Sequence, residues 1–157
     1  MTFSPQLEAR FAKLLASYPP GRERSAMIPM LLYAQDELGS VSDELIAEVA
    51  TRTGVTPLEV TGVISYYSML RRKPAGKYHV QVCTNVSCQL LGSDKLTEHI
   101  CARLKVKPGE TTPDKKFTVT EVECLGSCGT APMMQVNDEY YEGLTTEAVD
   151  KLLAELK

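Results

Sequence analysis

Residues 78–88 read Tyr78-His-Val-Gln-Val-Cys-Thr-Asn-Val-Ser-Cys88. Apolar and polar side chains alternate in the first half of this stretch, which is the pattern of a β-strand with one buried face. Cys83 stands where that strand should end, and Cys88 follows after a short polar segment. The stretch therefore predicts a strand that delivers a pair of thiols to the edge of a sheet.

A second pair of thiols, Cys124 and Cys128, repeats this arrangement, with 35 residues between Cys88 and Cys124. It follows another strand-like run, Phe117–Glu123. If the two strands are neighbours in one sheet, both thiol loops lie at the same edge and the four sulfurs converge. Glycine permits the tight turns that aim backbone N–H groups at sulfur, and Gly126 and Gly129 stand in the second loop.

Four converging thiolates favour a single inorganic centre. Structural zinc sites usually take cysteines two residues apart, although wider spacings occur, so zinc remains an alternative. A 2Fe–2S cluster is also held by four thiolates, and one of its known signatures contains the four-residue step found here between Cys83 and Cys88. Two disulfides are a further alternative. With four thiolate ligands the centre has no open position for substrate, which favours electron transfer over bond chemistry.

Composition places the chain among ordinary globular proteins. It has 157 residues, 43% hydrophobic and 24% charged, and a formal net charge of −3. This balance gives no attraction to nucleic acid or to an anionic membrane surface. The first residues lack the apolar run of a signal peptide, and no uncharged apolar stretch reaches the roughly 18 residues of a membrane span. We expect a soluble, cytoplasmic protein, in which clustered cysteines usually serve metal or redox chemistry.

The pattern changes at the basic connector Arg71-Arg-Lys-Pro-Ala-Gly-Lys77, which predicts two domains, residues 1–72 and 73–157. Every pattern before the connector is helical. Capping residues, prolines at helix starts and closing glycines predict a bundle of four helices. Pro29 predicts a kink or a late start in the second of them. The expected helix starts are Ser4, Arg22, Ser42 and Thr56.

After the connector the predicted order is β-α-β-β-β-α. A helix over residues 93–104 separates the two strands that lead into the thiol pairs. Residues 133–136 and 139–142 flank Asn137-Asp138 and predict a hairpin. Thr145 or Thr146 caps a last helix with an apolar stripe. The fold class predicted from these patterns is α+β.

The helical half also contains a possible helix-turn-helix, residues 45–60, with Gly54 in the turn. Together with the cysteines, it suggests a metal-sensing DNA-binding protein as a distant alternative. The would-be recognition helix, Thr56–Tyr67, contains no Arg, Lys, Asn or Gln to bind base edges. Residues 1–76 hold eight basic and eight acidic side chains, so the attraction to phosphate that dominates DNA affinity is missing.

Other chemically capable residues are assigned to structure. Cys101 lies in the middle of a predicted helix and is interpreted as a packing thiol. His79 and His99 are the only histidines, and we expect both to be at the surface or hydrogen-bonded within the fold. The patch from Tyr66 to Leu70 is assigned to the core rather than to an interface.

Several stretches resemble one family. Val82-Cys-Thr-Asn-Val-Ser-Cys88, Glu123-Cys-Leu-Gly-Ser-Cys-Gly-Thr-Ala-Pro132 and Tyr140-Tyr-Glu-Gly-Leu144 are similar to the 24-kDa-type 2Fe–2S subunit of respiratory complex I, NADH:quinone oxidoreductase. The helical half, with Gly39 and Gly54-Val-Thr-Pro-Leu-Glu-Val60, is similar too. Related subunits occur in NAD-linked hydrogenases and formate dehydrogenases, which are the alternative parent complexes.

The resemblance implies a helical bundle followed by a thioredoxin-like domain with one 2Fe–2S cluster on Cys83, Cys88, Cys124 and Cys128. It also implies an oxidoreductase subunit without a complete active site of its own. The cluster exchanges single electrons with the FMN of a partner flavoprotein that oxidises NADH. The chain lacks the G-x-G-x-x-G fingerprint, so NADH and FMN are expected on that partner alone. The expected place is the cytoplasmic face of the inner membrane, within the complex and without direct insertion.

Overall fold

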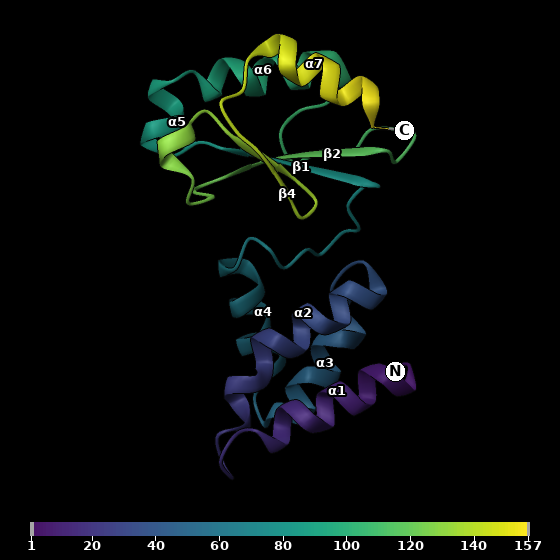
Figure 1. Ribbon diagram of the computed structural model, residues 1–157. Helices are drawn as coiled ribbons and strands as arrows, with labels where there is room; N and C mark the ends of the chain where they lie inside the picture. Colours follow the sequence, from purple (N-terminus) through teal and green to yellow (C-terminus); the bar gives the residue numbers. More distant parts are fainter. Residues whose placement is uncertain (1, 157) are drawn as a thin grey trace. The chain divides into compact units, whose positions relative to one another are not determined.

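The computed structural model describes residues 2–156 and divides the chain into two compact units, which meet between Pro74 and Ala75 in the sequence. The first unit is helical (Figure 1). A 3₁₀ turn, Glu23–Ala26, stands between its first two α-helices. The α-helices are α1 (Pro5–Ala16), α2 (Met27–Leu38), α3 (Asp43–Thr53) and α4 (Pro57–Tyr66).

Three of these helices begin at the predicted caps. The hydroxyls of Ser4, Ser42 and Thr56 each accept a hydrogen bond from a backbone N–H in the first turn of α1, α3 and α4. Thr56 and Glu59 complete a capping box, because the Glu59 carboxylate also accepts from the Thr56 N–H at 2.9 Å. These N-terminal predictions are confirmed.

The second helical segment starts late. Residues 23–26 form the 3₁₀ turn, and α2 runs only from Met27. Pro29 then falls in the first turn of α2, where its missing N–H removes no hydrogen bond that the helix needs. The late start expected from Pro29 is therefore what the chain adopts.

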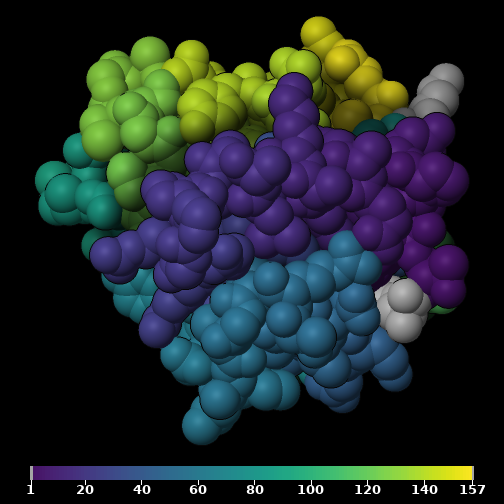
Figure 2. Space-filling model, turned by 90° about the horizontal axis from the view of Figure 1, so that it is seen from below, coloured from purple at the N-terminus to yellow at the C-terminus, as the bar shows by residue number. Residues whose placement is uncertain are grey.

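The core of the helical unit is made by its own apolar side chains, and Figure 2 shows the closely packed surface that encloses them. An arginine connects α3 to α1 at the edge of the bundle. The Arg52 guanidinium of α3 donates to both carboxylate oxygens of Glu8 on α1, at 2.6 and 2.8 Å, and its Nε donates to Glu48 at 2.7 Å. Such a two-pronged geometry is the strongest form of an arginine–carboxylate pair. Fully buried core residues include Phe11, Met30, Leu31, Leu45, Val49 and Val60.

The patch from Tyr66 to Leu70 is only partly in the core, which corrects the prediction. Leu70 is buried, but Tyr66 is 82% exposed and Met69 46% exposed. Helical geometry explains the difference. Ile64 lies on the core side of α4, and a residue two positions later points about 200° around the helix, away from that side.

The second unit is built on a four-stranded sheet of β1 (Tyr78–Cys83), β2 (Phe117–Val122), β3 (Met134–Val136) and β4 (Glu139–Tyr141). The strand order is β2-β1-β3-β4. β1 and β2 are parallel, whereas β3 is antiparallel to both β1 and β4. In the parallel pair Cys83 lies opposite Val122, so both strands end at the same edge of the sheet.

Two helices, α6 (Ser93–Leu104) and α7 (Thr146–Glu155), lie on one face of this sheet (Figure 1). Leu96 and Ile100 of α6 and Val149 of α7 pack with Val80 and Val119 of the strands into a second core. The alternation in β1 places Val80 and Val82 on that side, as the sequence predicts. Both main helices of this unit begin where expected, α6 at Ser93 and α7 after its cap Thr145.

A short helix that the sequence does not predict, α5 (Val86–Leu90), lies between Cys83 and α6. The polar residues of this segment are typical of a loop. The Asn85 side chain caps α5 by accepting from the Val86 N–H at 2.9 Å. With five residues, α5 is too short to show an apolar periodicity. No helix within residues 2–156 is long and apolar enough to span a membrane.

Candidate functional site

The two thiol pairs occupy the shared edge of the parallel strands. Cys83 is the last residue of β1, and Cys88 lies in α5 immediately beyond it. Cys124 follows the end of β2, and Cys128 begins a 3₁₀ turn, η2 (Cys128–Thr130). Cys83 and Cys88 are buried, whereas Cys124 and Cys128 are exposed. All four are free thiols.

Backbone hydrogen bonds fix the first pair to the sheet. The Cys83 N–H donates to the Met133 carbonyl at 3.2 Å, and the Thr84 N–H donates to the Val122 carbonyl at 3.0 Å. The chain is thus held against both neighbouring segments at the point where it leaves β1. Met133 and partly buried Leu125 then cover Cys83 and Cys88 in a small apolar cluster.

The second loop turns at Gly126, whose φ is +81°. A side chain would be strained in this conformation, and glycine adopts it freely. The turn lets the Gly126 N–H donate to the Cys124 Sγ at 3.3 Å, as predicted for this glycine. The prediction for Gly129 is wrong, because it lies in η2 without a positive φ.

The surroundings of the buried pair favour a thiolate. Burial raises the pKa of Cys83, but hydrogen bonds from the N–H groups of Asn85 and Leu125 and from the Cys88 and Cys124 thiols bring it below its usual range. Burial and the neighbouring Cys83 raise the pKa of Cys88. Cys83 thus loses its proton more readily than Cys88, and a bound metal would displace the protons of both thiols.

The same contacts connect the two thiol pairs. The Cys83 sulfur lies within hydrogen-bonding reach of Cys88 and Cys124, and the charge of Cys128 acts on Cys88. Within residues 2–156, no three His, Cys, Asp or Glu side chains gather as tightly as one metal ion requires. A 2Fe–2S cluster distributes four cysteines over two irons, so its ligands need not meet around one ion.

A segment that the sequence connects only with a family resemblance, Tyr140–Leu144, lies against the second thiol loop. The Tyr140 hydroxyl donates to the Leu125 carbonyl at 2.8 Å. The backbone N–H of Gly143 donates to Thr130 at 2.7 Å, and that of Leu144 donates to Pro132 at 3.0 Å. The sequence predicts the hairpin in which this segment begins, but it does not predict the contact of the segment with the thiol loop.

The spare cysteine stands apart from the four. Cys101 is half-buried in α6 and packs against the core of the second unit. Burial raises the pKa of the Cys101 thiol, and Glu121 and Glu110 raise it further. A protonated thiol in acidic surroundings is a poor nucleophile and a poor ligand.

Both histidines form hydrogen bonds within the fold, as predicted. His79 is 9% exposed, and its Nε2 lies 2.8 Å from the Thr120 hydroxyl. The His99 Nε2 lies 3.0 Å from Asp150 of α7.

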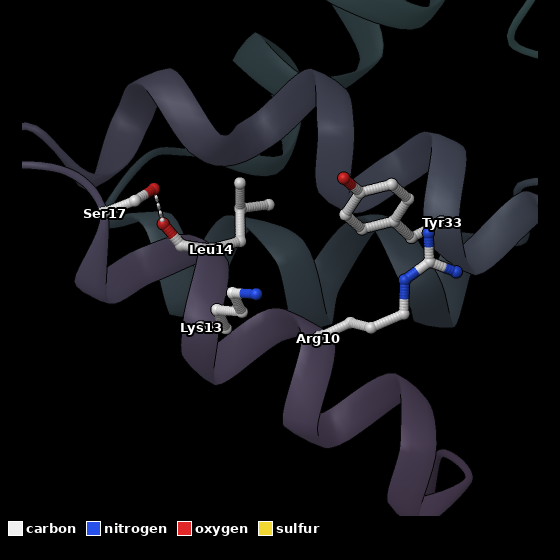
Figure 3. Close-up of a pocket in the computed structure, with 5 residues that line it drawn as sticks. All are labelled: Arg10, Lys13, Leu14, Ser17 and Tyr33. Carbon is white, nitrogen blue, oxygen red and sulfur yellow. Dashed lines mark hydrogen bonds between the residues drawn. The ribbon is translucent and has the colours of Figure 1, made fainter.

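The helical unit contains a surface pocket of about 300 Å³ (Figure 3). The Arg10 guanidinium lies over the Tyr33 ring at 3.8 Å from its centre, and the Ser17 hydroxyl donates to the Leu14 carbonyl at 2.6 Å. These polar groups are thus engaged with the protein itself, and no cysteine or histidine lines the pocket.

Comparison with known proteins gives the family. Residues 11–157 match the model of the thioredoxin-like [2Fe-2S] ferredoxins. The chain belongs to this family. The predicted family is thereby confirmed, and the 2Fe–2S cluster that gives the ferredoxin family its name is the cofactor of the chain. The four free thiols at one sheet edge, with N–H groups directed at sulfur, fit such a cluster.

Curated relatives of this ferredoxin match nearly its whole length. NADH-quinone oxidoreductase subunit 2 of Thermus thermophilus is 48% identical over 152 residues, which cover 96% of this chain and 82% of the relative. A subunit of the NADH-quinone oxidoreductase of Rhizobium meliloti is 41% identical, over 98% of this chain and 88% of the relative.

A solved structure has the same fold. An NAD⁺-reducing [NiFe]-hydrogenase in its H₂-reduced state superimposes with a TM-score of 0.73 at 24% identity, over 86% of this chain. The match spans only 23% of the hydrogenase chain. The predicted α+β class, with a thioredoxin-like second unit, is confirmed.

Proposed function

We propose that this ferredoxin is the electron-transfer subunit of an NADH–quinone oxidoreductase and holds its 2Fe–2S cluster on Cys83, Cys88, Cys124 and Cys128. The observation that supports this most is the placement of two thiol loops at the shared edge of the parallel strands β1 and β2. The cluster supplies one-electron chemistry when bound.

The residues of the chain have three tasks in this function. The four thiolates bind the cluster and leave no position open for substrate. Met133 and Leu125 keep water from the buried pair. The N–H groups of Asn85, Leu125 and Gly126 donate to sulfur, which stabilises negative charge there. These tasks suit a carrier of electrons rather than a site of bond chemistry.

The donor of those electrons is a second protein. The chain has no G-x-G-x-x-G fingerprint, and relatives with 41% to 48% identity are named as subunits of NADH-quinone oxidoreductase. We place NADH and FMN on a partner flavoprotein that exchanges single electrons with the cluster. The complex would hold the chain at the cytoplasmic face of the inner membrane.

The parent complex has an alternative in an NAD-linked hydrogenase or formate dehydrogenase. The fold shared with the NAD⁺-reducing hydrogenase supports this alternative. Purification of the native complex separates the two cases. Co-purification with a flavoprotein and a membrane arm would support the NADH–quinone oxidoreductase as the parent complex. Co-purification with a soluble hydrogenase or formate dehydrogenase would support the alternative.

The cofactor assignment is tested on the anaerobically purified chain. We expect about two irons and two acid-labile sulfides per chain, the content of one 2Fe–2S cluster. One zinc without sulfide would overturn the assignment, because zinc is the other metal that commonly takes four cysteines.

A further inference from the structure

Three hydrogen bonds between side chains concentrate at one point of the second thiol loop. The Glu142 carboxylate, just after β4, accepts from the hydroxyls of Ser127 and Thr130, the latter at 2.6 Å. The two hydroxyls also lie 2.9 Å from each other. With the Tyr140 hydroxyl on the Leu125 carbonyl, these contacts tie the loop to the end of the hairpin.

The loop residues in these contacts adjoin a cluster ligand. Ser127 directly precedes Cys128, and Thr130 closes the 3₁₀ turn that Cys128 begins. The Thr130 N–H donates to the Ser127 carbonyl at 3.2 Å, so Ser127, Cys128 and Thr130 form one tight turn. A carboxylate that binds both hydroxyls therefore holds the backbone of Cys128 from both sides.

Glu142 is negatively charged in this position. Hydrogen bonds from Ser127 and Thr130 hold the pKa of its carboxyl below the usual range. Its two partners are hydroxyls, which carry no positive charge that could cancel the carboxylate. A fixed negative charge beside a redox centre disfavours the reduced state, because reduction adds another negative charge.

We propose that Glu142 is a positioning residue of the cluster: its carboxylate holds the turn around Cys128 through Ser127 and Thr130, and its charge lowers the reduction potential. The proposal rests on the proposed function, since it takes Cys128 as a ligand. It gives the Tyr140–Leu144 motif a role, which is to clamp the exposed half of the cluster site to the sheet.

The test compares two substitutions at Glu142 in the full chain with its cluster. Glu142→Gln removes the charge and keeps an acceptor oxygen, whereas Glu142→Ala removes both. We expect both variants to have a higher midpoint potential than the wild type in a redox titration followed by electron paramagnetic resonance. We also expect an iron chelator to remove the cluster faster from Glu142→Ala than from the wild type.

Glu155→Gln is the matched control. It removes one carboxylate from the same unit, at the end of α7, which lies away from α5 and the thiol loops in Figure 1. A midpoint potential of Glu142→Gln equal to that of Glu155→Gln would overturn the proposal.

A third variant covers the case in which Glu142→Gln does not retain its cluster. Glu142→Asp keeps the charge with a shorter side chain, and restored cluster content in this variant would support the proposal. Failure of aspartate to restore it would contradict the role of the charge. Absence of iron and sulfide from the wild type itself would instead refute the proposed function.

Discussion

The five cysteines differ in what surrounds their sulfur atoms. Backbone N–H groups donate to the sulfurs of Cys83 and Cys124, and those at Cys83 lower the pKa of its thiol. Burial and the carboxylates of Glu121 and Glu110 instead keep the Cys101 thiol protonated. At the scale of single residues, backbone N–H groups directed at sulfur thus distinguish Cys83 and Cys124 from the spare thiol Cys101.

Two serine substitutions test this difference. Cys101→Ser should keep iron and sulfide at the wild-type level, because its thiol lies outside the proposed ligand set. Cys124→Ser should lose the cluster or change its electron paramagnetic resonance spectrum, because a hydroxyl is a poor replacement for a thiolate. Both are measured on anaerobically purified protein. Equal cluster loss in the two variants would show that the ligand assignment is wrong.

Among the single residues of the site, the cysteines can be predicted from the sequence and Glu142 cannot. The four thiols are visible because cysteine is rare and the spacing is local. The role of Glu142 is not, because its partners Ser127 and Thr130 lie 15 and 12 residues earlier. The antiparallel pairing of β4 with β3 brings Glu142, just after β4, close to the thiol loop in space.

At the scale of elements, local signals place most helix starts and strand ends. Caps such as Thr56 act within three residues, so the sequence contains all that is needed to find α4. Elements that lack a local signal are missed or misjudged. Helix α5 has no room for a periodic pattern, and the exposure of Tyr66 depends on which side of α4 faces the core.

The capping box of α4 predicts a dependence on pH. Hydrogen bonds from the backbone N–H and the hydroxyl of Thr56 lower the pKa of Glu59 from 4.5. A carboxylate whose pKa is lowered by folding stabilises the fold above its ordinary pKa and loses that effect as the pH falls through the folded value. The stability advantage of the wild type over Glu59→Gln should therefore shrink as the pH falls below 4.5.

Urea unfolding of residues 1–74, followed by far-ultraviolet circular dichroism between neutral and acidic pH, measures this difference. Thr61→Ala is the control, since the Thr61 hydroxyl donates a hydrogen bond to the Pro57 carbonyl of the same helix, and this bond involves no titrating group. Thr56→Ala should cost about 0.5–2 kcal/mol near neutral pH, the usual range for loss of such a cap. A Glu59→Gln difference that stays constant with pH would contradict the role of the carboxylate.

At the scale of the whole molecule, each unit has a core made only of its own residues. The helical unit packs around residues such as Phe11 and Met30, and the sheet unit packs around Val80 and Ile100. All four proposed ligands belong to the sheet unit, after the division at Ala75. The change from helical to alternating patterns at the basic connector is a sequence signal of this division.

Residues 75–157 alone should therefore fold and hold the cluster. The expected result for this fragment is the iron and sulfide content of the full chain and the same electron paramagnetic resonance spectrum. The Cys124→Ser fragment serves as its control. A fragment that folds, as judged by circular dichroism, but retains no iron would show that the helical unit contributes to the site.

The unequal burial of the thiols has a consequence for biogenesis. Cys83 and Cys88 lie 2% and 1% exposed at the back of the site, while Cys124 and Cys128 face water. We expect iron and sulfide that arrive from solvent to meet the exposed pair before the buried pair. We likewise expect a peroxide or dioxygen to oxidise the two exposed thiols before the buried pair.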